Sequence, residues 1–264
     1  MSDFLCVEKY RPQKIKYCSL TEELKNTLSK VLKQKEIPLL VLSCAAGTGK
    51  TTGARALCEE LGSDYIIING SDEGRQIDTV RSKIKNFAST VSLTEDANHK
   101  VVIIDEADDM NADSVQPSRR IFIETFYKNC RFIFTCNYKN KIIPALHSRC
   151  TVVDFKIVNG QRVKTATAFL KRLEGVLKDE NIEFDKKVLA ELIQKYYPDF
   201  RRTINELQRY SVRGKIDSGR LFNLSEANTK ALVKILKEKR FTDMRKWVVQ
   251  NLDKEASSLF KTLY

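Results

Sequence analysis

The chain has 264 residues, of which 42% are hydrophobic and 30% are charged, and its formal net charge is +12. This length supports two or more domains, and the composition is that of a folded globular protein, which excludes a disordered or fibrous chain. Most of the basic excess lies after residue 155. It indicates either an anionic partner such as nucleic acid or basic helix faces exposed to water, and charge alone leaves both interpretations open.

The sequence also argues against a membrane or secreted protein. No apolar run approaches the ~20 residues of a membrane span, and residues 1–12 lack the apolar stretch of a secretory signal. The seven cysteines are odd in number and no two have C-x-x-C spacing, which is typical of free thiols in a reducing compartment. We therefore expect a cytoplasmic protein with no membrane partner.

Apolar strands and amphipathic helices alternate through the first 155 residues. Leu24, Leu28 and Val31 recur at helical spacing, so we expect a helix over 22–35. Further helices are expected over 52–61, 77–88 and 118–129. Apolar runs predict strands at 39–42, 65–69, 100–106, 131–136 and 152–155. Five such strands separated by helices are typical of an α/β fold in which helices cover both faces of a parallel sheet.

From Gln161 onward the pattern is helical only. Apolar residues at helical spacing predict three helices, which together form a small all-α domain. Residues 225–264 also have helical spacing, but so few helices rarely bury a core alone, so we expect an incomplete domain or a missing partner there. The expected division of the chain is 1–158, 159–222 and 223–264.

The stretch Leu39 to Thr52, L-L-V-L-S-C-A-A-G-T-G-K-T-T, joins an apolar strand to a helix through small residues. This setting is typical of a phosphate-binding P-loop, whose backbone N–H groups turn inward around phosphate oxygens. Lys50 would reach the β- and γ-phosphates, and the Thr51 hydroxyl would bind Mg²⁺. Cys44 departs from the usual pattern, which has glycine at this position. The alternative interpretation is an ordinary strand-to-helix turn.

The strand at 100–106 ends in two acidic residues, Asp105 and Glu106. Asp105 could hold Mg²⁺ directly or through water, and Glu106 could polarise the attacking water as a general base. Two acids at a strand end are often only solvated, but these follow a P-loop with one intervening strand. Together the two motifs predict nucleotide hydrolysis, and the intervening strand separates the chain from the GTPase and nucleotide-kinase branch.

Several motifs in order resemble those of the AAA+ ATPases. They are G-T-G-K-T-T at 47–52, I-I-D-E-A-D-D-M at 103–110, T-C-N at 135–137 and S-R-C at 148–150. E-K-Y-R-P at 8–12 and D-F-R-R at 199–202, together with S-R-C, resemble sliding-clamp loaders of the replication-factor-C type. N-G-S-D-E at 69–73, I-D-T-V-R at 77–81 and N-F-A-S at 86–89 are most similar to the large, ATPase subunit of T4-like bacteriophage clamp loaders.

The resemblance covers about residues 8–224 and implies a fold. That fold is an AAA+ P-loop domain with a three-layer α/β architecture and a parallel sheet, followed by an all-α lid domain. After the lid comes the beginning of an α-helical collar domain, which we expect to be incomplete in this chain.

The resemblance also implies roles at an ATP site. Asn137 would be sensor 1, in contact with the γ-phosphate or the attacking water. Arg201 would be sensor 2 and contact phosphate in the same subunit, with the adjacent Arg202 as an alternative. Arg149 would be an arginine finger for the ATP of a neighbouring subunit. The residues expected around the nucleotide are Tyr10, Arg11 and Pro12 on the adenine side and Gly47, Thr48, Gly49, Lys50, Thr51 and Thr52 at the phosphates.

Contacts with the phosphates of primer–template DNA follow from the same resemblance. The helix that begins at Ile77 would direct its N-terminus and Arg81 at the DNA backbone. Asn69 could hold Glu106 in an inactive pose until DNA binds. A solvated charge is the alternative for each basic residue, and Pro117 departs from the family pattern. The residues expected at this interface are Arg75, Ile77, Arg81, Lys83, Lys85, Gln116 and Arg120.

The implied function is that of the ATPase subunit of a sliding-clamp loader, with ATP and Mg²⁺ as cofactors. Its partners would be primer–template DNA, a ring-shaped clamp and other loader subunits, in the host-cell cytoplasm if a phage encodes it. ATP binding would open the clamp, and hydrolysis triggered by DNA would release it. The alternatives are another AAA+ DNA-associated ATPase, such as a helicase loader or branch-migration motor, and a scaffold subunit that does not hydrolyse ATP.

Overall fold

The structure is a computed structural model, and it describes residues 6–70, 77–90, 99–110, 125–126, 130–157, 159–211, 215–216, 235–238 and 240–250. Most of the helix expected over 118–129 lies outside these ranges, as do large parts of 223–264. The described helices and strands agree with the alternation expected for the first 155 residues.

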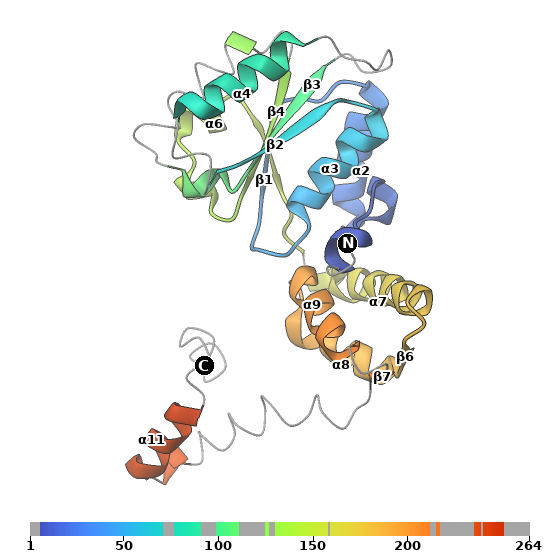
Figure 1. The fold of residues 1–264 in the computed structure, drawn as a ribbon, viewed down its shortest axis with the longest axis vertical. Helices are drawn as coiled ribbons and strands as arrows, with labels where there is room; N and C mark the ends of the chain where they lie inside the picture. The colour runs from blue at the N-terminus through green and yellow to red at the C-terminus, as the bar shows by residue number, and fades with distance from the viewer. Residues whose placement is uncertain are drawn as a thin grey trace.

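The first domain is built on a five-stranded parallel sheet in the order β2-β3-β4-β1-β5 (Figure 1). Each strand is a short, mostly apolar run, and this confirms the predicted strand positions to within one or two residues. Because β4 lies between β1 and β3, the loops that follow these three strands meet at one edge of the sheet. The strands are β1 (Leu40–Ser43), β2 (Tyr65–Asn69), β3 (Lys100–Asp105), β4 (Cys130–Cys136) and β5 (Thr151–Asp154).

Helices cover both faces of the sheet, as predicted for buried parallel strands (Figure 1). One face is covered by α2 (Glu22–Gln34), α3 (Lys50–Leu61) and the short helix η1 (Ile15–Tyr17). The other face is covered by α4 (Ile77–Ser89) and α6 (Pro144–His147). Local signals set these helices: the Thr21 side chain caps α2 by accepting a hydrogen bond from Leu24 N, and Gly62 ends α3 in a left-handed conformation.

The second domain packs α7 (Arg162–Asp179), α8 (Lys186–Tyr196) and α9 (Phe200–Ser211) around a core of their own. Phe169, Leu173, Leu189 and Leu192 are buried in this core. The prediction that this part is helical only was wrong in one respect. Strands β6 (Glu183–Phe184) and β7 (Lys215–Ile216) form a parallel pair, and two residues each are too short for an alternating pattern to reveal them.

Two further helices, α1 and α11, lie outside these layers. The N-terminal helix α1 (Cys6–Lys9) lies at the junction of the two domains and packs against α9 (Figure 1). Helix α11 (Phe241–Gln250) lies apart from both domains in the same view. The helices of the described residues are all too short or too polar to cross a membrane. The six cysteines whose side chains are described are free, as expected.

Gly70 lets the end of β2 approach the loop after β3. A Cβ at this position would lie 2.3 Å from the carbonyl oxygen of Glu106 and 2.9 Å from that of Asp105. Backbone atoms cannot move aside as a flexible side chain can, so we expect Gly70→Ala to lower the free energy of unfolding by about 2 kcal/mol. Thermal and urea unfolding would measure this change.

A glycine on the surface of α7 provides the matched control. A Cβ at Gly175 meets no atom within 4 Å, and the residue is inside a regular helix. Gly175→Ala should therefore raise the free energy of unfolding by up to about 1 kcal/mol, because alanine loses less backbone entropy. Equal effects of the two substitutions would contradict the close approach at Gly70.

Candidate functional site

The loop after β1 has the backbone of a phosphate-binding loop. Gly47 and Gly49 have φ of 75° and 90°, in the left-handed region that glycine adopts at little cost. Cys44 is not among the described non-glycine residues with positive φ, so its side chain fits the loop without backbone strain. The glycine expected at this position by the usual pattern is therefore not required by the local conformation.

Lys50, the first residue of α3, is buried beneath this loop. Its ammonium group donates hydrogen bonds to the carbonyls of Cys44 and Ala45 at 2.8 and 2.9 Å. It also donates to Asn137 Oδ1 at 3.0 Å, which joins the loop after β1 to the turn after β4. Burial lowers the pKa of Lys50, and nearby acidic groups, the Cys44 thiol first and then Asp105, partly offset this effect. An anion bound in the loop would stabilise the charged form further.

Asp105, at the end of β3, is hydrogen-bonded to residues of two other elements, α3 and β4. The Thr51 hydroxyl donates to Asp105 Oδ1 at 2.7 Å, and the Thr135 hydroxyl donates to the same oxygen. Thr135 also accepts a hydrogen bond from Glu106 N at 3.2 Å. Thr135 is 1% exposed and was not predicted as a site residue, although it stands in the T-C-N motif. Its hydroxyl fixes the two acidic residues relative to each other.

Glu106 adopts a left-handed conformation, with φ of 54°. Such a conformation costs a non-glycine residue about 1 kcal/mol or more and is often found at functional sites. The tight turn η3 (Ala107–Asp109) follows at once. The hydrogen bond that Glu106 N donates helps to hold this conformation. The hydrogen bonds that Asp108 accepts, two residues further on, hold the turn that follows.

Asp108 connects the turn after β3 to the turn after β4. Its carboxylate is buried, at 4% exposure, and accepts hydrogen bonds from Asn137 N at 3.1 Å and Tyr138 N at 3.0 Å. Sequence reasoning missed this role, because Asp108 is one of several acids in a row and the pattern does not say which is buried. Asp108 thus sets the position of Asn137 relative to Glu106.

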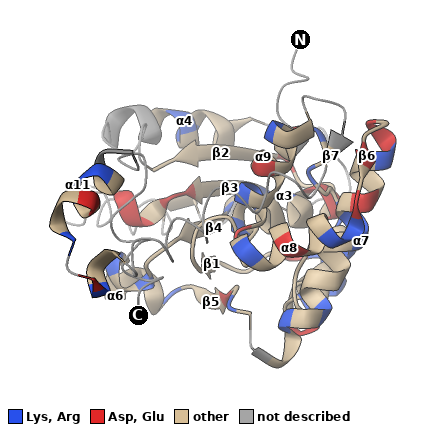
Figure 2. Cartoon of the chain, turned by 90° about the horizontal axis from the view of Figure 1, so that it is seen from below, with Lys and Arg blue, Asp and Glu red and all other residues tan. Residues whose placement is uncertain are grey.

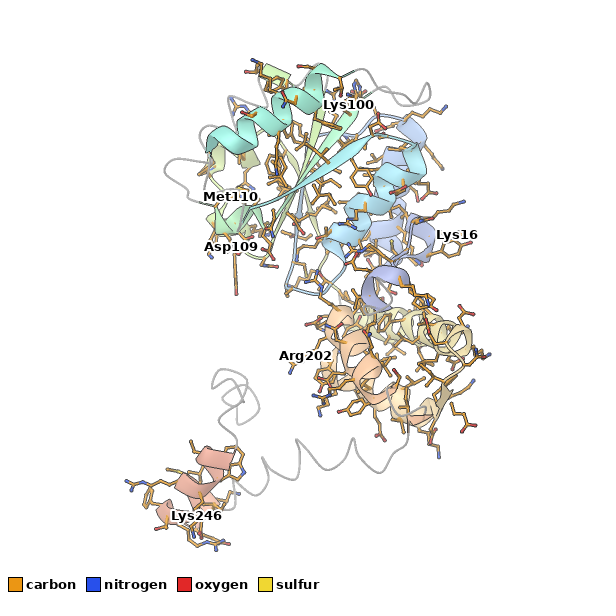
Figure 3. The ribbon with its side chains drawn as sticks, viewed as in Figure 1. Lys16, Lys100, Asp109, Met110, Arg202 and Lys246 are labelled. Carbon is orange, nitrogen blue, oxygen red and sulfur yellow. The ribbon has the colours of Figure 1, made fainter. Side chains whose placement is uncertain are left out.

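The second domain closes the site from the opposite side. Phe200 N donates a hydrogen bond to Gly47 O at 3.0 Å, so the start of α9 rests directly on the loop after β1. Arg201 lines the cavity beside this contact. Arg202 instead packs over the Tyr196 ring at 4.8 Å and projects from the outer side of α9 (Figure 3). The structure therefore brings Arg201, not Arg202, to the site.

The cavity between these elements has a volume of about 120 Å³ and is lined from both domains. It gathers the predicted residues of the P-loop, the acidic pair, the T-C-N motif, the N-terminal segment and the second domain. The roles of these residues stay predictions. The predicted residues that line it are Tyr10, Arg11, Pro12, Gly47, Thr48, Gly49, Lys50, Thr51, Thr52, Asp105, Glu106, Asn137 and Arg201.

Two oxygen donors at the wall of this cavity fit Mg²⁺. It prefers oxygen ligands and usually keeps waters and substrate phosphates in its coordination sphere. The Thr51 hydroxyl and the Asp105 carboxylate lie together at the cavity wall, 2.7 Å apart. Across the described ranges there is no cluster of three His, Cys, Asp or Glu side chains that could hold an ion alone. The two oxygen donors therefore fit Mg²⁺ bound together with phosphate.

Arg149 lies outside this cavity, as far as the described residues define its lining. It follows α6, its side chain is exposed, and its guanidinium donates to Ala145 O at 2.9 Å. Asn69 ends β2 in register with Asp105. The expected contact of Asn69 with Glu106 stays a prediction.

The residues expected to contact DNA are only partly described. Lys83 and Lys85 are exposed on α4, whose basic residues are visible in Figure 2. Ile77 and Arg81 lie in α4, but their side chains are outside the described part of the structure. Arg75, Gln116 and Arg120, with Pro117, fall outside it altogether. Lys100, labelled in Figure 3, donates to Phe87 O at 2.8 Å and anchors the end of α4 to β3.

The fold and the site define a P-loop ATPase of the AAA class. The family model of the ATPase family associated with various cellular activities (AAA) matches residues 40–157. The Holliday junction branch migration motor RuvB of Thermotoga maritima superposes with a TM-score of 0.62, over 87% of this chain and 80% of that chain. Its sequence identity is 18%, so this likeness shows the fold alone.

Relatives in sequence define the family more narrowly. A model of the sliding-clamp-loader large subunit, AAA+ ATPase lid domain, matches residues 161–222. The replication factor C small subunit of Saccharolobus solfataricus is 35% identical over 254 residues, which is 93% of this chain and 74% of that relative. The sliding-clamp-loader large subunits of Enterobacteria phage T4 and Escherichia phage RB69 are 40% and 38% identical over 215 residues. The chain belongs to the clamp-loader family of AAA+ ATPases.

The alignment covers only part of each phage relative. It covers 80% of this chain and 66% of each of the two phage proteins. The chain therefore spans about two thirds of the length of these relatives.

The buried carboxylate of Asp108 leads to a test of the site's framework. We expect Asp108→Asn to lower the free energy of unfolding by about 1–3 kcal/mol, because an amide cannot accept both backbone hydrogen bonds as well as a carboxylate can. Asp109→Asn is the control, since Asp109 is exposed and pairs with Lys141 at 3.7 Å; its effect should stay within about 0.5 kcal/mol. Urea unfolding of both variants measures the difference, and similar losses would remove Asp108 from the framework.

Proposed function

We propose that this chain is the ATPase subunit of a sliding-clamp loader. ATP binding would hold neighbouring subunits in a spiral that opens the ring-shaped clamp. Hydrolysis, stimulated by primer–template DNA together with the clamp, would release the clamp on the DNA. The observation that carries the proposal is the composite cavity, which joins P-loop, acidic pair and second domain in a chain whose relatives are clamp-loader subunits.

The side chains at the cavity suggest how the reaction proceeds. Lys50 would exchange its carbonyl partners for phosphate oxygens, which accept stronger, charge-assisted hydrogen bonds. Glu106 would polarise the attacking water. The hydrogen bond from Glu106 N to the Thr135 hydroxyl would hold Glu106 in position. Asn137 would orient that water or contact the γ-phosphate. Mg²⁺, bound by Thr51 and Asp105 with phosphate, would neutralise the negative charge that develops during transfer.

Two arginines would complete the site from different sides. Arg201, on α9 of the lid domain, lines the cavity and would contact phosphate in the same subunit. Arg149 is exposed away from the cavity and is therefore available to a neighbouring subunit's ATP. The site would then be active only in an assembly, and loss of the γ-phosphate would weaken the contact between subunits.

Other features support a clamp loader over the two alternative functions. A scaffold subunit has no need of an intact constellation of Lys50, Asp105, Glu106 and Asn137 around one cavity. Another DNA motor is favoured only by the fold likeness to RuvB, at 18% identity, against 40% identity to a clamp-loader subunit. The domain division that fits this proposal is an ATPase domain over 1–158, a lid over 159–222 and a collar beginning at 223.

DNA would bind along α4. The N-terminus of this 13-residue helix carries partial positive charge, and Lys83 and Lys85 are exposed on its surface. The expected partners are backbone phosphates, so binding would depend on shape and charge rather than on base sequence.

ATP turnover tests the proposed function directly. In a complex reconstituted with the other loader subunits, we expect turnover to rise at least tenfold when primer–template DNA and the clamp are added together. Glu106→Gln should bind ATP with unchanged affinity but lose at least 99% of turnover, because the base is lost while the binding groups remain. Turnover that does not change when DNA and clamp are added would overturn the loader assignment. Loss of ATP binding in Glu106→Gln would overturn the role of Glu106.

The proposed trans role of Arg149 predicts a dependence on assembly. Arg149→Ala should reduce turnover about a hundredfold or more in the assembled complex and leave any basal turnover of the isolated chain unchanged. Lys139→Ala is a suitable control, because Lys139 is a nearby exposed cation that pairs with Asp154 at 3.1 Å. An equal fall in the isolated chain would show that Arg149 acts on its own subunit's nucleotide.

A further inference from the structure

The N-terminal strap, defined here as residues 6–20, crosses from the lid to the ATPase domain and passes the cavity between them. At its start, α1 packs against α9 of the lid. At its end, Ile15, Cys18 and Leu20 are buried in the core beneath α2 and α3, and Ile15 N donates to Glu60 Oε2 at 2.9 Å. Between these anchors, residues 10–12 line the cavity.

One side chain of the lid holds the strap at two points, on either side of residues 11–16. Arg172, on α7, donates from one guanidinium nitrogen to Tyr17 O at 2.8 Å and from another to Tyr10 O. It also lines the cavity itself. A guanidinium is planar and presents its donors in a fixed fork, so two bonds from one group fix the distance between the two carbonyls. Arg172 thus closes residues 11–16 into a loop whose geometry depends on α7.

The end of α7 makes a second attachment to the strap. The Tyr10 hydroxyl donates to Glu180 Oε1 at 2.6 Å, and the Lys9 ammonium donates to the same oxygen at 2.7 Å. The bond from Lys9, and after it the bond from Tyr10, lowers the pKa of Glu180. The same bond to Glu180 raises the pKa of the Tyr10 hydroxyl. These three side chains are more exposed to water than the contacts of Arg172 are. Solvent therefore screens their interactions, which contribute less to holding the strap.

We propose that Arg172 is a positioning residue that sets the wall of the cavity formed by Tyr10, Arg11 and Pro12, so that this wall moves with the lid. The proposal rests on nucleotide binding as put forward above and gives the wall its role: it would confine the base, while the P-loop holds the phosphates. Lid closure would then bring Arg201 to the phosphates and the wall to the base in one movement, because α7 and α9 share a core.

The consequence is a division of affinity between the two ends of the nucleotide. Ligands with a base depend on the wall, whereas a ligand that is only a phosphate chain depends on the P-loop and Arg201. A general loss of folding at Arg172 would weaken both kinds of ligand alike. The ratio of the two affinities therefore separates positioning from stability.

The test compares ATP with inorganic tripolyphosphate, both with Mg²⁺, on the full 264-residue chain. We expect Arg172→Met to raise the Kd for ATP about tenfold, through loss of charge-assisted hydrogen bonds, and to leave the Kd for tripolyphosphate within twofold. Arg172→Lys, whose ammonium lacks the fork and reaches one carbonyl at a time, should give an intermediate value. Lys171→Met is the control: Lys171 is exposed next to Arg172 on α7, and both affinities should be unchanged.

Each result decides the matter. An unchanged ATP affinity in Arg172→Met, or equal losses for ATP and tripolyphosphate, would overturn the proposal. If Arg172→Met does not fold, as judged by its circular dichroism and melting curve, the same ratio measured on Arg172→Lys decides. A wild-type chain that binds neither ligand would instead overturn the proposed nucleotide site. In steady-state turnover of the assembled complex, positioning predicts a higher KM for ATP with kcat within about twofold.

Discussion

The order of three parallel strands is the constraint on which the site depends. Because β4 lies between β1 and β3, strand β1 has no backbone pairing with β3, and only the Thr51 side chain, at the start of α3, reaches Asp105 directly. The end of β4 adds two further links, since Thr135 binds Asp105 and Asn137 binds Lys50. Gly70 N adds β2 to this arrangement by donating to Asp105 O at 2.7 Å. Backbone register thus sets the positions of the polar side chains before any ligand is considered.

The framework is shared between two parts, each with a core of its own. The sheet positions the P-loop, the acidic residues and Asn137. Large apolar side chains on its strands, such as Phe132 and Phe134, are buried and stabilise the sheet. The lid has its own core and meets the sheet domain at Phe200 and along the strap. A cavity between two cores changes shape when the cores rotate, whereas a cavity within one core does not. Rotation of the lid would therefore change the affinity of the cavity for a ligand.

Much of this arrangement could be predicted from local patterns in the sequence. Apolar runs located the five strands, and glycine with lysine and threonine after the first strand located the phosphate loop. What could not be predicted are contacts between residues far apart in the chain: Thr135 with Asp105, Asp108 with Asn137, and Arg172 with Tyr10. No periodicity or spacing carries such information, because each contact depends on how elements pack. The two-residue strands β6 and β7 were missed for the related reason that they are formed by pairing alone.

Single residues show where packing resolves what sequence leaves open. Arg201 and Arg202 are the same residue type, so the sequence does not distinguish them. Side chains of adjacent residues on a helix, however, differ by about 100° in direction. Only one of them can face the cavity, and the contact of Arg202 with the Tyr196 ring fixes which. Cys44 is a similar case, since the usual glycine is replaced without a positive φ. Its carbonyl, not its side chain, is what Lys50 contacts, so the loop depends on backbone shape at this position.

The three acceptors of Lys50 also suggest how the site could register a ligand. Two are carbonyls of the loop and the third is the amide of Asn137, on a turn held by Asp108. A phosphate oxygen competes with all three, because it is a stronger acceptor for an ammonium group than a neutral amide or carbonyl is. Movement of Lys50 toward phosphate would free the Asn137 side chain while Asp108 keeps its backbone in place. The amide could then turn to the ligand without any change in the sheet, as the predicted sensor role of Asn137 requires.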